Sequence, residues 1–200
     1  YGTGNIASLL SSVNSLNSYA YLANTSQDLK KANALILPGV GHYGHALNNL
    51  HKNSLTQTVI NLVESGLPTL GICLGFQILT KSSEEADGIP GLGLLNLETK
   101  RLKQDFPKRY KIPHIGWNSL TQINKKLKLL KGIPKKDQLF YFCNSYGVNF
   151  LDEFKGISAE YTHENNMIAV AEYENIYGVQ FHPEKSRKQG LKIINNFLNL

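Results

Sequence analysis

Hydrophobic side chains recur along this chain with two periods, one typical of helices and one typical of strands. In the first half, stretches with helical spacing alternate with short apolar runs that end in glycine-containing turns. The stretch 55–64, for example, has apolar side chains at Leu55, Val59 and Val63. The pattern predicts helices at 6–16, 55–64 and 76–79, and strands at 19–22, 34–37 and immediately before Cys73.

The second half of the chain is richer in strand-like alternation. It predicts strands at 139–142, 156–161, 168–173 and 177–181, and a closing helix at about 189–198. Alternating helices and strands followed by a β-rich part favour one α/β domain over residues 1–200. We expect a central, mostly parallel sheet with an antiparallel portion and helices on both faces. Ligands of such sheets bind beyond the strand ends, where loops carrying Asn5, Val40, Cys73 and His182 would meet.

Composition narrows the class of protein. The 200 residues are 42% hydrophobic, which is enough for one buried core. The two cysteines, Cys73 and Cys143, provide no disulfide framework, and we expect a cytoplasmic protein. No apolar run approaches the roughly 20 residues of a membrane-spanning helix, so no membrane partner is expected.

The net charge of +6 is spread unevenly. From Lys100 to Lys136 there are twelve Lys or Arg residues against one acid, Asp105. This stretch could form a surface for an acidic partner or a phosphorylated ligand. Nucleic-acid binding is disfavoured because aromatic stacking residues are not interleaved with the lysines. We favour a solvated lysine-rich face.

The segment Gly71-Ile72-Cys73-Leu74-Gly75 predicts a sharp turn between a strand and a helix. A nucleophile exposed at the end of a strand needs such a crowded elbow, and small flanking residues permit it. The helix that follows would favour a thiolate at Cys73, and the amide of Leu74 could bind an oxyanion. The competing interpretation is an ordinary buried cysteine.

The segment His182-Pro183-Glu184 offers the partners that such a thiol needs. His182 could accept the thiol proton and later deliver it to a leaving amine. Glu184 could hold the other ring nitrogen and fix the tautomer. Taken alone, His182 could equally be a surface histidine before a proline turn.

These two segments resemble the signatures of class I (triad) glutamine amidotransferases. The resemblance extends over the whole chain and is closest to the glutaminase subunits of imidazole glycerol phosphate synthase. It rests on 1–5, Leu37-Pro38-Gly39-Val40-Gly41, 71–77, Pro113-His114-Ile115-Gly116-Trp117-Asn118 and 178–186. It implies a flavodoxin-like fold, hydrolysis of L-glutamine through a glutamyl thioester on Cys73, and no cofactor or metal.

The resemblance also assigns roles to further residues. Cys73, His182 and Glu184 match the triad, and Val40 and Gly41 match the oxyanion loop, although a simple strand-ending turn is the alternative there. Glycines around Val40 permit a peptide flip that would aim an N–H at the oxyanion. The positions that match glutamine-binding residues are Gln77, Glu85, Asn144, Ser145 and Tyr146. By itself, Glu85 would be an unremarkable glutamate.

In the family, the glutaminase docks on a (β/α)8-barrel cyclase subunit, which receives the ammonia. The positions that match the interface are Asn5, Trp117, Asn118 and Lys185. A core position is the alternative for Trp117. The family also has a short apolar strand before the position of Tyr1, so we expect the natural chain to start earlier and the sheet to lack that strand.

One residue departs from the family pattern, because a histidine is expected where Asn144 stands. Asparagine keeps hydrogen-bonding groups but cannot take up a proton at neutral pH as histidine can. Three hypotheses follow: the histidine-pathway glutaminase, a paralogue that supplies ammonia for amidino-sugar synthesis in surface polysaccharides, and an idle scaffold for a barrel. The intact triad disfavours the scaffold.

Overall fold

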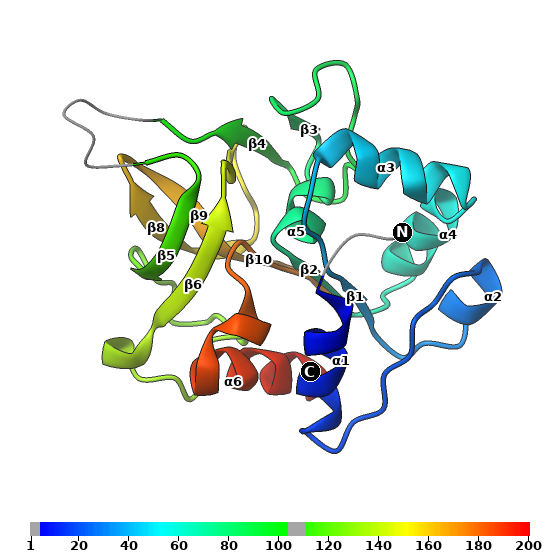
Figure 1. The fold of residues 1–200 in the computed structure, drawn as a ribbon, viewed down its shortest axis with the longest axis horizontal. Coiled ribbons are helices and arrows are strands. Elements are labelled where there is room, and N and C mark those ends of the chain that lie inside the picture. The colour runs from blue at the N-terminus through cyan, green and yellow to red at the C-terminus, as the bar shows by residue number, and fades with distance from the viewer. Residues whose placement is uncertain (1–4, 104–110) are drawn as a thin grey trace.

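Three adjacent strands run parallel at one side of the main sheet. They are β1 (Leu35–Leu37), β2 (Thr69–Ile72) and β10 (Ile176–Val179), with β2 in the middle. They belong to a computed structural model that describes residues 5–103 and 111–200 (Figure 1). Because all three are parallel, the loops after them leave the same edge of the sheet.

Beyond β10 the sheet continues mostly antiparallel, in the order β1-β2-β10-β9-β7-β4-β3, with β8 paired to β9. Two further strands, β5 and β6, form a separate antiparallel sheet. The bounds are β3 (Ser82–Ser83), β4 (Leu97–Arg101), β5 (His114–Ser119), β6 (Leu139–Asn144), β7 (Tyr146–Phe150), β8 (Ile157–His163) and β9 (Asn165–Tyr173).

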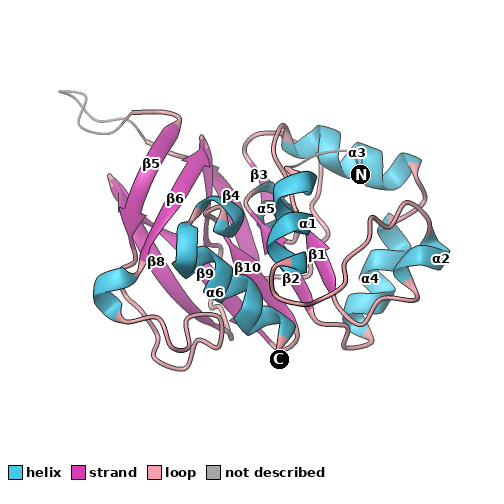
Figure 2. Cartoon of the chain, turned by 60° about the horizontal axis from the view of Figure 1, so that its bottom comes forward, coloured by secondary structure: helices cyan, strands magenta, loops and turns pink. Residues whose placement is uncertain are grey.

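Helices cover both faces of the main sheet, as Figure 2 shows from a second direction. On one face, α1 and α6 contribute Val13 and Phe197 to a cluster with Leu70 of β2. On the other face, α3, α4 and α5 pack against β1 and β9. The bounds are α1 (Ile6–Asn14), α2 (Ser26–Leu29), α3 (Tyr43–Lys52), α4 (Thr56–Glu64), α5 (Leu74–Ile78), α6 (Arg187–Leu198) and the 3₁₀ turns η1 (Lys135–Asp137) and η2 (Pro183–Lys185).

The predicted α/β architecture is confirmed, although the antiparallel portion is the more extensive one. The predicted helices correspond to α1, α4, α5 and α6, and the predicted strands after 22 to β1, β2, β6, β8, β9 and β10. The prediction did not include α2, α3, β3, β4, β5 or β7. In the described part of the chain, no helix is both long and apolar enough to cross a membrane.

The predicted strand at 19–22 is wrong. These residues pair with no strand among those described, and the side chain of Tyr19 is 87% exposed. Residues 19–22 and the edge strand β1 line the same apolar groove of about 810 Å³, and this groove separates them. Alternation alone does not make a strand when no neighbouring backbone is within hydrogen-bonding reach.

Two predictions fall partly outside the described residues. The motif at 1–5 is described only at Asn5, and residues 104–110 of the lysine-rich stretch, with Asp105, are not described.

Candidate active site

Cys73 lies where β2 ends and α5 begins, in a backbone conformation that few side chains adopt. Its φ is +53° and its ψ is −109°. A non-glycine residue in such a conformation costs about 1–3 kcal/mol, and the surrounding structure must hold it there. The N–H of Cys73 donates to the carbonyl of Val179 at 2.8 Å, which ties the elbow to β10. The predicted sharp strand-to-helix turn is confirmed.

The glycines on either side of the elbow have a steric reason. A Cβ on Gly71 would lie 2.7 Å from the carbonyl oxygen of Gly75, and a Cβ on Gly75 would collide with the carbonyl of Leu37. The turn therefore folds back on itself and onto β1 more closely than any side chain allows. The N–H of Leu74 belongs to the first turn of α5, where such groups have no acceptor within the helix.

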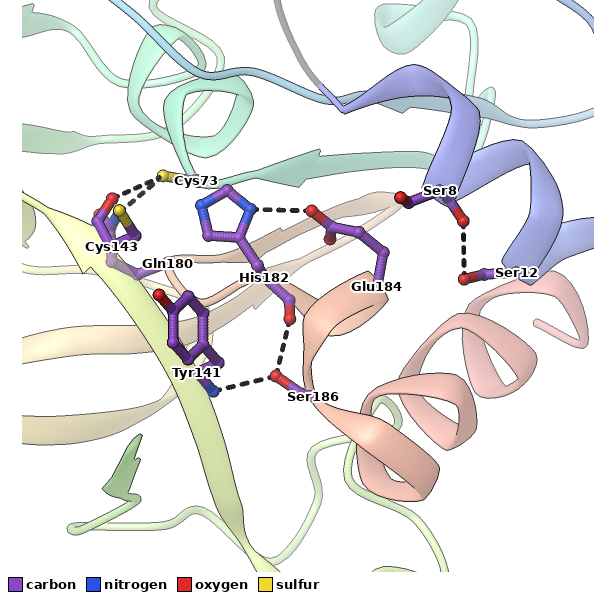
Figure 3. Close-up of polar contacts among 9 residues, drawn as sticks. All are labelled: Ser8, Ser12, Cys73, Tyr141, Cys143, Gln180, His182, Glu184 and Ser186. Atoms are coloured by element: carbon purple, nitrogen blue, oxygen red, sulfur yellow. Dashed lines mark hydrogen bonds and ion pairs between the residues drawn. The ribbon is translucent and has the colours of Figure 1, made fainter. Parts of the chain in front are cut away.

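His182 and Glu184 follow β10, the neighbour of β2. The Nδ1 atom of His182 lies 2.9 Å from Oε1 of Glu184, and both side chains are buried, with exposures of 2% and 5%. Figure 3 shows the imidazole ring between Cys73 and Glu184, with its second nitrogen on the side of the sulfur. That nitrogen, Nε2, has no hydrogen bond of ordinary geometry to any residue that the structure describes.

The His182 backbone is fixed from two sides. Its N–H donates to the carbonyl of Tyr141 on β6 at 2.9 Å, and its carbonyl accepts from Oγ of Ser186 at 2.7 Å. Ser186 also accepts from the N–H of Tyr141 at 3.0 Å (Figure 3). Ser186 is fully buried, and the sequence analysis gave it no role.

The charges around His182 favour its protonated form. Burial of the ring by itself lowers the pKa of His182, but the Cys73 sulfur and the Glu184 carboxylate outweigh this and raise it to about 10. A protonated imidazole thus lies between the sulfur of Cys73 and a carboxylate that orients it. The sulfur and this ring can act as nucleophile and proton donor in acyl transfer.

Cys73 opens onto a pocket of about 280 Å³. Nine of its lining residues were predicted as site residues, and the other two are Pro113 and Cys143. The nine are Val40, Gly41, Cys73, Leu74, Gln77, Glu85, Asn144, Ser145 and Tyr146. These nine come from four separate segments of the chain, which the parallel strand ends and β6–β7 bring together.

Polar groups in this pocket are already oriented. Oε2 of Glu85 accepts from the N–H of Tyr43 at the start of α3, at 2.8 Å. Nδ2 of Asn144 donates to the carbonyl of Tyr146 at 2.9 Å and to the hydroxyl of Tyr161 at 3.0 Å. Its Oδ1 is buried and has no hydrogen-bond partner in the described residues.

The sequence analysis assigned no role to Gln180, which contacts the nucleophile. Its Nε2 lies 3.6 Å from the sulfur of Cys73, and the residue is fully buried. The carbonyl of Cys143 lies 4.0 Å from the same sulfur. Gln180 stands two residues before His182 in the segment that follows β10, and this two-residue spacing was a usable signal. No sequence pattern indicates the carbonyl.

The four predicted interface residues lie outside the pocket. Trp117 is 39% exposed and packs edge-on against Tyr141, with the Arg187 guanidinium 4.8 Å from its ring centre. Lys185 lies 5.8 Å from the Tyr141 ring centre. Trp117 is therefore a surface residue rather than a core residue.

The other two interface candidates are placed differently. The amide of Asn118 donates to the carbonyl of Thr162 at 3.0 Å, which joins β5 to β8. Asn5 is exposed at the start of α1 and does not line the pocket.

Comparisons with known proteins agree with this geometry. The family model "Glutamine amidotransferase class-I" matches residues 3–200. The chain is 41% identical to "Imidazole glycerol phosphate synthase subunit HisH" of Methanocaldococcus jannaschii, over all of this chain and 96% of that protein. It is 36% identical to "Imidazole glycerol phosphate synthase subunit HisH 1" of Campylobacter jejuni strain RM1221, over all of this chain and 97% of that protein.

A solved structure shares the fold. "Structure of PurLQS from Thermotoga maritima" includes a chain that superposes with a TM-score of 0.69, covering all of this chain and 94% of that one. The sequence identity is 20%, so this likeness concerns the fold alone.

Proposed function

This chain belongs to the class-I glutamine amidotransferase family, and we propose that it is the glutaminase subunit of an imidazole glycerol phosphate synthase in histidine biosynthesis. The observation that carries the proposal is the line of Cys73, His182 and Glu184, in which Cys73 opens onto a small pocket. Full-length relatives named as subunits of that synthase support the pathway.

The proposed reaction has two halves. The Cys73 thiolate attacks the side-chain amide carbon of glutamine, and the C–N bond breaks as His182 gives its proton to the leaving nitrogen. This releases ammonia and leaves a glutamyl thioester. Water then attacks the thioester while His182 takes its proton, and glutamate leaves with Cys73 again a thiolate. Glu184 keeps the imidazole in one orientation throughout.

The negative charge on the carbonyl oxygen needs donors. The N–H of Leu74 is free of intrahelical partners and adjoins the sulfur. Val40 and Gly41 line the same pocket, and Gly41 has a φ of +118° with open space around it. A rotation of the peptide between them would bring a second N–H toward the oxyanion.

Other lining residues of the pocket suit the α-amino group of glutamine. Glu85 supplies a carboxylate for the substrate ammonium, which is a charge-assisted contact. Asn144, Ser145 and Tyr146 line the same pocket and would hold the rest of the substrate.

We propose that the partner is a (β/α)8-barrel cyclase subunit and that Trp117 and Lys185 contribute to the surface that meets it. Large exposed side chains such as Trp117 are typical anchors of an interface. A docked partner would receive ammonia without release to water, where most of it would be protonated and unreactive. The proposed compartment is the cytoplasm, where both free cysteines would stay reduced.

Asn144 favours a second candidate, the paralogue that supplies ammonia for an amidino sugar. The residue lies in the pocket wall at the position where the family pattern has histidine. Both candidates share the glutamine half-reaction, so the barrel partner distinguishes them.

The test is glutamate release from glutamine by the chain alone, with the cyclase subunit of its organism's histidine pathway plus that subunit's nucleotide ligand, and with any second barrel subunit encoded beside sugar-nucleotide genes. Strong stimulation by the first barrel is the expected result. Stimulation by the second barrel only would move the sugar paralogue to first place. The proposed function would be overturned if, with either barrel present, the protein released glutamate no faster than the Cys73→Ala variant.

A further inference from the structure

Gln180 is fully buried beside the nucleophile at the end of β10. Its Nε2 lies 3.6 Å from the sulfur of Cys73, and its Oε1 lies 3.2 Å from Nε2 of Gln77. A buried amide that lacks partners is costly, so both ends of this side chain must find them within the protein. One of those partners is the sulfur.

The direction of the amide follows from a backbone carbonyl. Nε2 of Gln77 donates to the carbonyl oxygen of Tyr146 at 2.8 Å, and a carbonyl can only accept. The amide nitrogen of Gln77 therefore points into this corner, and its second hydrogen faces Oε1 of Gln180. Gln180 must then turn its own N–H groups toward Cys73. The chain Tyr146–Gln77–Gln180–Cys73 fixes a donor at the sulfur.

The other neighbour of the sulfur has the opposite character. The carbonyl of Cys143, at 4.0 Å, can accept from a thiol but repels a thiolate. Within the described residues, Gln180 is the side-chain amide that donates to this sulfur. A donor favours the charged form of its acceptor, and it also restrains where the sulfur lies.

We propose that Gln180 stabilises and aims the Cys73 thiolate, and that Gln77 is a positioning residue that keeps the Gln180 amide in its productive orientation. This inference rests on the proposed role of Cys73 as nucleophile. Gln180 does not line the pocket, so it acts on the sulfur rather than on the substrate. Gln77 lines the pocket, so it can affect the substrate directly and the sulfur through Gln180.

The first test uses the free protein without glutamine. Alkylation of Cys73 by iodoacetamide is followed by peptide mass spectrometry from pH 5 to 10, with the exposed Cys143 of the same molecule as the internal reference. Gln180→Met should slow Cys73 alkylation about tenfold at pH 7, and the rate should recover at high pH, where the thiol ionises without help. Gln77→Met should slow it about threefold, because the amide of Gln180 can then turn over.

A matched control removes a different buried amide. Gln138 is 8% exposed and donates to the carbonyl of Ile133 at 3.0 Å, at the end of β6 opposite the pocket. Gln138→Met should leave the Cys73 profile unchanged. An equal slowing in Gln138→Met, or an unchanged profile in a folded Gln180→Met, would overturn the inference. If Gln180→Met does not fold, Gln180→Glu keeps the shape and replaces the donor, and it must slow alkylation at least as strongly.

Kinetics with the partner subunit separates this inference from the proposed function. Gln180→Met should lower kcat about tenfold with little change in KM, because the pocket wall is intact. If the wild-type protein hydrolyses glutamine and Gln180→Met matches it in kcat and alkylation, the inference fails and the function stands. If the wild-type protein does not hydrolyse glutamine while the alkylation profile shifts as expected, the function fails and the thiolate contact stands.

Discussion

At the carboxyl-terminal edge of β1, β2 and β10, the reactive side chains are buried, whereas on the outer face of the β5–β6 sheet large apolar side chains face solvent. Cys73 and His182 are 6% and 2% exposed, but Ile115 and Trp117 are 60% and 39% exposed. The first region fixes the positions and charges of a few side chains, chiefly Cys73, His182 and Glu184, that act in the reaction. The second offers area for contact. We therefore expect substitutions in the two regions to affect different measurements.

The largest expected effect comes from Cys73→Ala. It deletes the nucleophile and little volume, so partner-stimulated glutamate release should fall by about 10⁴-fold or more. Binding to the proposed barrel subunit, measured by calorimetry, should stay within about twofold of the wild-type value because the β5–β6 face is untouched. Hydrolysis that survives in this variant would remove Cys73 from the mechanism.

Glu184→Gln should come next. The carboxylate helps to raise the pKa of His182 to about 10 and holds the imidazole ring in one orientation. Its loss should lower that pKa and let the ring rotate. We expect kcat to fall about a thousandfold and the basic limb of the pH profile to move to lower pH. Glu64→Gln, an exposed substitution at the end of α4, is the control. A variant with an unshifted basic limb would contradict the role of this carboxylate.

Trp117→Ala probes the other region. Removing this exposed aromatic side chain should raise the dissociation constant for the proposed barrel subunit about 10- to 100-fold. The kcat at saturating partner should stay near the wild-type value. Tyr19→Ala is the control, because it removes an exposed aromatic beside the groove at β1. A loss of kcat with unchanged binding would show that the two regions are not separable.

Asn144→Leu should give the smallest of these effects. Asn144 joins the end of β6 to Tyr146 and Tyr161 and lines the pocket. Losing these bonds should raise KM for glutamine about tenfold and change kcat less. Asn196→Leu removes a side chain that also donates to two carbonyls, but near η1 and α6, and KM should not change. Equal KM values in both variants would remove Asn144 from substrate binding.

The sequence predicted the fold class, but it predicted the strands of the sheet only in part. Short motifs identified Cys73, His182 and Glu184, because an elbow and a His-Pro-Glu turn have strict local requirements. The strand at 19–22 was wrong and β4 and β7 were missed, because pairing depends on which backbone lies alongside. Gln180 was missed for a similar reason: its importance comes from a sulfur 107 positions away in the chain.

The central claim is that Cys73 carries the glutamyl group, and one measurement tests it most directly. The complex with the barrel subunit is mixed with ¹³C-labelled glutamine, quenched in acid during turnover, digested and examined by mass spectrometry. The account predicts the labelled glutamyl group on the peptide that contains Cys73, and none in Cys73→Ala. Glutamate release with no label on Cys73, or with label on another residue, would contradict it.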